Sequence, residues 1–72
     1  MEDDLEKFLE LMRVEMAEHE KVYEDTWKKQ SIEFLEQRMN AKQNEFRLTK
    51  NPEKLISLAN LAMLLYVRRK NG

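Results

Sequence analysis

The 72-residue chain is one domain at most, has no cysteine and carries a formal net charge of −1. These features exclude disulfides, thiolate zinc sites and thiol chemistry, and a chain this short buries only about 60% of its unfolded surface. Tight helix packing, a bound ion or oligomerisation must therefore help to stabilise it.

Residues that favour helices dominate the sequence, and we expect an all-α, single-domain fold over residues 1–72. The expected helices span about residues 3–24, 32–48 and 52–69 and form a helical bundle by homodimerisation. In the first helix one apolar seam recurs at spacings of 4, 3, 4, 3 and 4, through Leu5, Leu9, Met12, Met16, His19 and Tyr23. The seam predicts that the His19 ring is buried or hydrogen-bonded between helices.

A short connection over residues 25–30 precedes the second helix, for which Ser31 is a suitable N-cap. The apolar stripe of this helix is interrupted over one turn, where Lys42 and Gln43 stand in place of an apolar residue. The gap indicates either a solvated bulge in the packing or a polar pocket between helices.

The third helix begins at Asn51 and Pro52, which suit the N-cap and the first helical position. Apolar residues surround the helix over residues 55–67, where Ser57 and Asn60 are the only interruptions. A helix that is apolar on all sides is buried on all sides, and two further helices of the same chain cannot enclose it. We therefore predict that the partner of this chain is itself, in a homodimer or tetramer through residues 55–67.

Residues 1–4 are acidic at positions 2–4 and do not resemble a signal peptide, and the apolar run is shorter than the roughly 20 residues of a membrane span. We therefore expect a cytoplasmic protein without a membrane partner. Residues 1–27 hold ten acids and three bases, whereas residues 28–72 hold ten bases and four acids. An acidic helix against more basic ones explains this asymmetry, and a nucleic-acid-binding surface is the less favoured alternative.

Several motifs lie in a suggestive order: Tyr-Glu-Asp-Thr-Trp-Lys, Phe-Leu-Glu-Gln-Arg-Met, Glu-Phe, Asn-Pro-Glu-Lys and Ser-Leu-Ala-Asn-Leu-Ala-Met-Leu. Over residues 18–70 they resemble the MazG-like superfamily of all-α NTP pyrophosphohydrolases. The most specific motif, at residues 57–64, resembles the Asp-Val-Ala-Asn-Phe-Ala-Met-Met stretch of that family. The resemblance implies a bundle that dimerises or tetramerises. In active members it also implies Mg²⁺ held by Glu-x-x-Glu on one helix and Glu-x-x-Asp on the next.

Carried over by position, the first acid pair falls on Lys42 and Glu45 and the second on Lys54 and Ser57. Glu45 is the only acid among these four residues. Because Mg²⁺ requires several carboxylate oxygens, we predict no metal site, no cofactor and no pyrophosphohydrolase activity.

Two lysines in place of acids would turn a cation site into an anion site. We therefore treat five residues as a vestigial site or a site for phosphate or nucleotide: Lys42, Glu45, Lys54, Ser57 and Asn60. Asn60 either makes a structural hydrogen bond or retains a contact with a ligand. Trp27 is either a hydrophobic plug or a platform for base stacking.

The favoured function is a non-catalytic MazG-like homo-oligomer that serves as a structural or regulatory module, or binds a nucleotide or a protein. The first alternative is a Mg²⁺-dependent nucleoside triphosphate pyrophosphohydrolase with a rearranged metal site, for which a shifted alignment offers Glu33 and Glu36 as an acid pair. The second alternative is a small helical nucleic-acid-binding protein.

Overall fold

A computed structural model describes residues 1–71, except for the side chains of residues 22 and 25–28. All of its regular secondary structure is helical, in the order α1 (Glu2–Glu18), α2 (Glu20–Lys29), α3 (Ile32–Thr49) and α4 (Glu53–Asn71). The predicted all-α fold is therefore confirmed. Within the described residues, no helix is long and apolar enough to cross a membrane.

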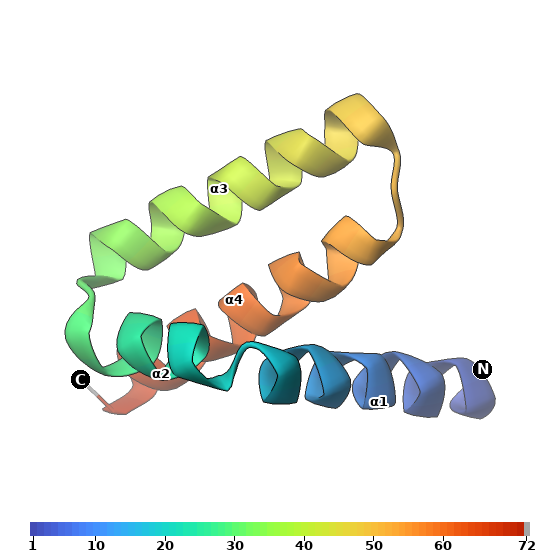
Figure 1. Cartoon of the computed structure of the whole chain (residues 1–72), viewed down its shortest axis with the longest axis horizontal. Coiled ribbons are helices and arrows are strands. Elements are labelled where there is room, and N and C mark those ends of the chain that lie inside the picture. Colours follow the sequence, from blue (N-terminus) through green and yellow to red (C-terminus); the bar gives the residue numbers. More distant parts are fainter. Residues whose placement is uncertain (72) are drawn as a thin grey trace.

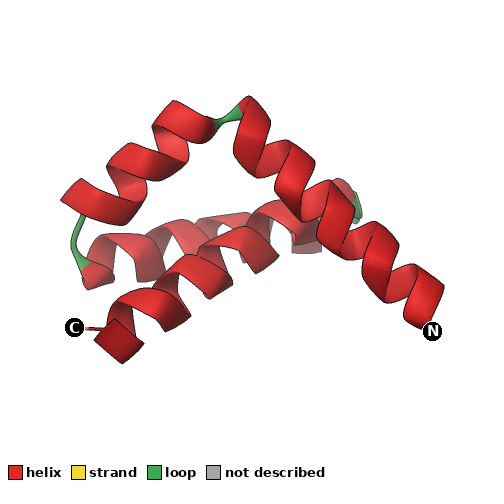
Figure 2. Cartoon of the chain, turned by 90° about the horizontal axis from the view of Figure 1, so that it is seen from below, coloured by secondary structure: helices red, strands yellow, loops and turns green. Residues whose placement is uncertain are grey.

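The helices form two layers. α3 and α4 lie antiparallel as a hairpin and make the most extensive contact between elements (Figure 1). α1 and α2 form a bent second layer over this hairpin, and the N-terminal end of α1 extends beyond it (Figure 2). α1 packs on α4, so α4 contacts both α3 and the second layer.

Local capping determines where α3 and α4 begin and where α3 ends. The Ser31 hydroxyl accepts a hydrogen bond of 3.1 Å from the Phe34 backbone N–H, which confirms Ser31 as the predicted N-cap. The Asn51 side chain accepts a 3.0 Å bond from the Glu53 N–H at the start of α4. α3 ends at Lys50, whose left-handed backbone (φ 56°) closes the helix in the way that glycine usually does.

The predicted first helix is divided in two at His19, which has a non-helical backbone (φ −117°, ψ 31°). The hydrogen-bond ladder still includes this residue. Its N–H donates to the Glu15 carbonyl at 3.0 Å, and its own carbonyl accepts from the Tyr23 N–H at 2.9 Å. His19 is exposed, so the expectation of a buried ring was wrong. The expected connection at residues 25–30 is mostly helical, because no glycine or proline ends α2 before Lys29.

The apolar core lies between α3 and α4 and is small. Among the described side chains, Leu35, Leu61 and Leu64 are the only apolar ones that are buried. Asn60 is fully buried beside them. Large apolar side chains elsewhere remain exposed, including Met63 and Tyr66 on the outer side of α4.

Candidate functional site

Three of the predicted site residues come together between α3 and α4. Lys42 approaches the Oε2 atom of Glu45 from one turn away on α3, with its Nζ at 3.4 Å. Lys54 approaches the same oxygen from α4, with its Nζ at 3.6 Å. The hairpin therefore forms a cluster in which two ammonium groups share one carboxylate oxygen, and we call Lys42, Glu45 and Lys54 the lysine cluster.

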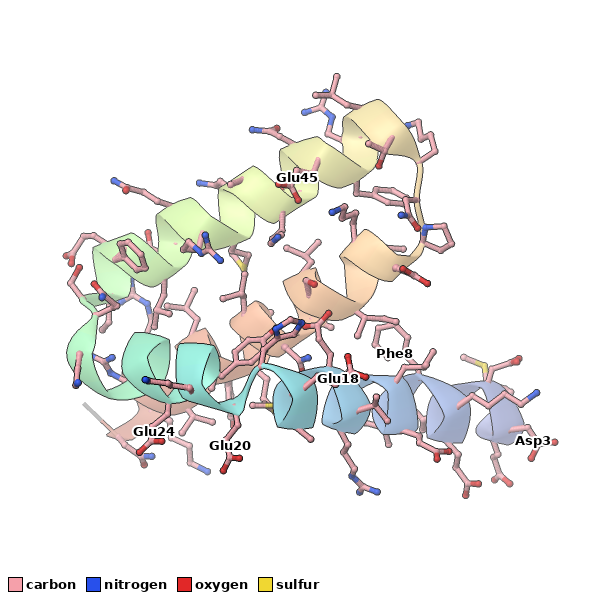
Figure 3. The ribbon with its side chains drawn as sticks, in the orientation of Figure 1. Asp3, Phe8, Glu18, Glu20, Glu24 and Glu45 are labelled. Atoms are coloured by element: carbon pink, nitrogen blue, oxygen red, sulfur yellow. The ribbon has the colours of Figure 1, made fainter. Side chains whose placement is uncertain are left out.

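The charge of Lys42, and then that of Lys54, lowers the pKa of Glu45 below its ordinary value. The side chain is 45% exposed, although the two lysines cover its Oε2 atom. Figure 3 shows Glu45 on α3, well separated from the acids Glu20 and Glu24, which extend from α2 on the side away from α3. The lysine cluster is thus a surface ion-pair group with one more positive than negative charge.

Ser57 and Asn60 do not join this cluster, because both bind a different carboxylate, that of Glu15 on α1. The Ser57 hydroxyl donates to Glu15 Oε2 at 2.6 Å, and the Asn60 amide donates to Glu15 Oε1 at 3.1 Å. The same amide also donates to the Met12 carbonyl at 3.2 Å. The hydroxyl of Tyr23 on α2 donates to Glu15 Oε1 as well. We call Glu15, Tyr23, Ser57 and Asn60 the Glu15 network.

The Glu15 network keeps this carboxylate ionised. Partial burial raises the pKa of Glu15, but the hydrogen bonds from Ser57, Tyr23 and Asn60 outweigh burial and leave the pKa below its ordinary value. Burial and the neighbouring carboxylate raise the pKa of Tyr23, so its hydroxyl remains protonated and donates. A carboxylate with a lowered pKa and three donors is a poor proton acceptor. The arrangement is therefore suited to holding helices together rather than to acid–base catalysis.

Asn60 is the most constrained polar residue of the described part. It is fully buried, and its amide nitrogen has two acceptors, but its Oδ1 atom has no hydrogen-bond partner. Asn60 therefore makes hydrogen bonds within the chain. These bonds join α4 to α1.

A polar cavity of about 170 Å³ connects the two groups of residues. Side chains from both layers line it: Glu15, His19, Tyr23, Arg38, Lys42, Ser57 and Leu61. The interrupted apolar stripe of α3 therefore corresponds to a polar pocket between helices, which was one of the two predicted explanations. In the described part of the chain, no three His, Asp or Glu side chains form a group that could hold a metal ion.

Sequence reasoning missed Glu15, although a signal was present. Glu15 lies three residues after Met12 and four before His19, so it shares a helix face with the apolar seam. Its other partners could not be predicted, because Ser57 and Asn60 are more than 40 residues away in the sequence. The predicted stacking residue Trp27 has a side chain outside the described residues.

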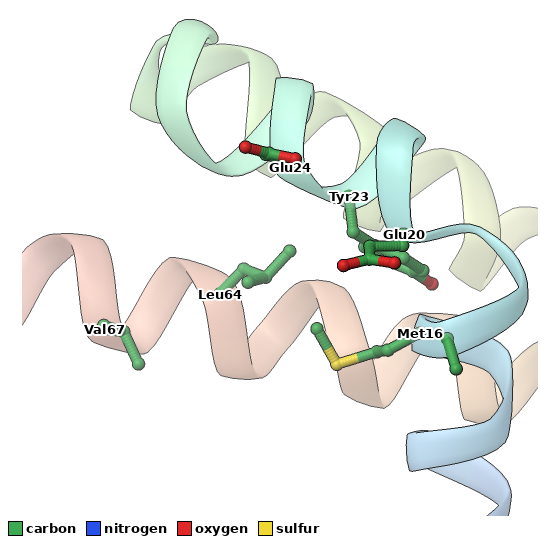
Figure 4. A pocket seen from close by; sticks show the side chains of 7 residues that line it. Met16, Glu20, Tyr23, Glu24, Leu64 and Val67 are labelled. Atoms are coloured by element: carbon green, nitrogen blue, oxygen red, sulfur yellow. The ribbon is translucent and has the colours of Figure 1, made fainter.

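A second, larger concavity lies between α1, α2 and α4 and shares Tyr23 with the polar cavity. This groove of about 710 Å³ has apolar walls formed by Met16 of α1 and by Leu64 and Val67 of α4 (Figure 4). Glu20 and Glu24 of α2 lie along its edge. Tyr23 of the Glu15 network also lines this groove, whereas no residue of the lysine cluster does.

In comparisons with known proteins, no protein-family model, curated protein or solved structure matches the chain.

Proposed function

We propose that this chain is a non-catalytic helical module that acts as a homo-oligomer and retains a MazG-like scaffold. The observation that carries the proposal is the uncovered outer side of α4. Tyr66 is 65% exposed and Met63 is 37% exposed on a helix that has no charged residue from 55 to 67. Complete burial of an exposed large apolar side chain is worth about 1.5–3 kcal/mol, and covering the part of Met63 and Tyr66 that remains exposed gains a fraction of that for each.

The small core supports the same proposal. Leu35, Leu61 and Leu64 are the buried apolar side chains of the described part. Cores of chains this short rarely supply more than roughly 3–5 kcal/mol without a staple. Since the chain has no cysteine, a second copy that covers α4 is the simplest additional source of stability.

The lysine cluster supports the absence of catalysis. A divalent cation at Glu45 would have to displace two ammonium groups, at 3.4 and 3.6 Å, from its only carboxylate. Like charges repel, and one carboxylate holds Mg²⁺ weakly. Binding of an anion there is also disfavoured, because Glu45 already faces both lysines. The convergence of Lys42, Glu45 and Lys54 across two helices nevertheless fits the position that the resemblance implies for the acids.

Sedimentation velocity at micromolar concentration tests the assembly. We expect a particle of at least twice the 8.8 kDa chain mass. A folded particle of 8.8 kDa would refute the proposal.

Incubation with deoxynucleoside triphosphates and Mg²⁺, followed by pyrophosphate detection, tests the absence of catalysis. Turnover that Glu45→Gln abolishes would show that the chain is an enzyme.

A matched pair of variants, each with one alanine replaced by glutamate, tests the role of α4. Ala62 on α4 and Ala41 on α3 are both exposed. Ala62→Glu places a charge on the uncovered apolar face and should dissociate the oligomer, whereas Ala41→Glu should leave the mass unchanged. Equal masses for the two variants would contradict a role for α4. Circular dichroism on the same samples shows whether helix content is lost together with the oligomer.

A further inference from the structure

We infer that α4 pairs with α4 of a second copy in an antiparallel, two-fold arrangement, with residue 55 opposite residue 66 of the partner and residue 59 opposite residue 62. This inference rests on the proposed homo-oligomer and adds the contact surface and the direction of the helices. Four features support this pairing: an uncovered stripe on α4, the sizes of the residues in that stripe, the charges at the ends of α4 and an adjoining groove.

The stripe consists of Leu55, Ala59, Ala62 and Tyr66, at spacings of 4, 3 and 4 residues. This is the spacing of a seam between two packed helices. Ala62 and Tyr66 are exposed, and Leu55 and Ala59 are half-buried. The residues of α4 that the chain itself buries, Asn60, Leu61 and Leu64, do not belong to the stripe. One copy therefore uses one side of α4 and leaves the stripe for another copy.

The residue sizes along the stripe are symmetrical about its centre. Large side chains stand at both ends, Leu55 and Tyr66, and small ones stand in the middle, Ala59 and Ala62. In an antiparallel pair a two-fold axis passes between the two alanines, where the helix axes can approach closely. Each large end then packs against the other large end of the partner, so the surface is self-complementary.

The charges at the ends of α4 favour the antiparallel direction. The last turn carries Arg68, Arg69 and Lys70. A parallel pair would bring these three cations next to the same three cations of the partner. An antiparallel pair instead brings them next to the start of the partner's α4, where the charges of Glu53 and Lys54 balance and the cations meet less repulsion. The helix dipoles also favour this direction, because opposite partial charges become neighbours.

The surface beside the stripe can accept a side chain of the partner. A groove of about 510 Å³ runs along the α3–α4 side of Tyr66 and is lined by Met39, Ala62, Leu65, Tyr66, Arg69 and Lys70. In the antiparallel register this groove faces the partner's Leu55. An apolar side chain that enters an apolar groove between two helices is the usual unit of helix packing.

Disulfide trapping tests the direction of the helices, because the natural chain has no cysteine. Leu55→Cys and Tyr66→Cys lie 11 residues apart, which is about 16 Å along a helix. A disulfide requires Cα atoms within about 7 Å. We expect an oxidised mixture of the two variants to form mainly the mixed 55–66 dimer, resolved by intact mass. Each variant alone should form few crosslinks.

Two controls make the result decisive. Leu48→Cys, at an exposed position on α3, reports crosslinking by random collision. If either end of α4 fails to tolerate cysteine, Ala59→Cys and Ala62→Cys test whether the two stripes meet. These positions lie only about 4.5 Å apart along the helix, so the readout of direction is then the ratio of mixed 59–62 to same-residue crosslinks. Crosslinking of residue 55 to itself would overturn the antiparallel direction, as would crosslinking no greater than that of the control.

Failure of this inference can be distinguished from failure of the proposed function. A monomer in sedimentation velocity refutes both. A stable oligomer whose residues 55 and 66 do not crosslink to each other refutes the antiparallel α4 pairing and leaves the homo-oligomer intact.

Discussion

Glu15 and Glu45 are two carboxylates of the described part of the chain that each have several side-chain partners, and they are held in different ways. Neutral donors from α2 and α4 surround Glu15, whereas two lysines surround Glu45. Both groups of partners lower the pKa of the acid. The first arrangement joins α1 and α2 to α4 through directed bonds in a half-buried region. The second is an exposed ion-pair cluster that salt screens.

This difference indicates where the polar interactions stabilise the fold. Directed bonds to a half-buried carboxylate leave donors without partners when the acid is removed. Exposed ion pairs contribute little, because water and salt compete with them. We therefore expect the Glu15 network to determine how the two layers are joined, and the lysine cluster to have little effect on stability.

The largest effect should follow removal of the carboxylate from the Glu15 network. Glu15→Ala leaves the hydroxyls of Ser57 and Tyr23 without this acceptor and leaves the Asn60 amide with the Met12 carbonyl alone. It should destabilise the chain by about 2–3 kcal/mol. Chemical denaturation at one fixed protein concentration measures this, because the stability of an oligomer depends on concentration. Glu18→Gln, on an exposed part of α1, is the control. Equal losses in the two variants would mean that the network does not stabilise the fold.

A smaller effect should follow loss of the side-chain hydrogen bond between Tyr23 of α2 and Glu15 of α1. Tyr23→Phe keeps the ring but removes the hydroxyl that donates to Glu15, and should cost about 1 kcal/mol. The same change in a Glu15→Ala background provides the control, because the hydroxyl has already lost its acceptor and its removal should then have little further effect. If Tyr23→Phe has no effect, another contact must hold α2 against α1.

Acid should weaken the fold through both carboxylates. Because the folded chain holds the pKa of Glu15 below its ordinary value of 4.5, its contribution is fully present above that value. The contribution is lost as the pH falls through the folded-state pKa. Glu15→Gln should therefore make the free energy of unfolding less dependent on pH in this acidic range. An unchanged slope would show that Glu15 does not titrate differently in the folded and unfolded chains.

The smallest effect should come from the lysine cluster. Glu45→Gln removes an exposed acid that faces Lys42 and Lys54, and the change should shrink further as salt is added. Denaturation at low and high ionic strength measures it, with Glu15→Gln as the comparison. A large loss that salt does not reduce would mean that the two carboxylates are not held in different ways.

The starts of α3 and α4 could be predicted, because the capping side chain of each lies within three residues of the bond that it accepts. Ser31 and Asn51 fulfil the expected roles. The polar gap at Lys42 was also visible in the sequence, but whether it is a pocket depended on what α1 places opposite it. The break at His19 has no local signal, since neither glycine nor proline is near. In an unbroken helix, residues 15 and 23 would lie about 12 Å apart along the axis, so the bend allows Tyr23 to reach Glu15.

The sequence by itself determined that the chain is helical, where α3 and α4 begin, and that α4 has no charged residue from 55 to 67. These properties follow from residue types and from spacings of three or four residues. Only the tertiary structure decided which hydrogen bonds the Glu15 carboxylate accepts from the other helices. The donors that hold Glu15 come from α2 and α4, 8 to 45 residues away, and only folding brings them within hydrogen-bond distance.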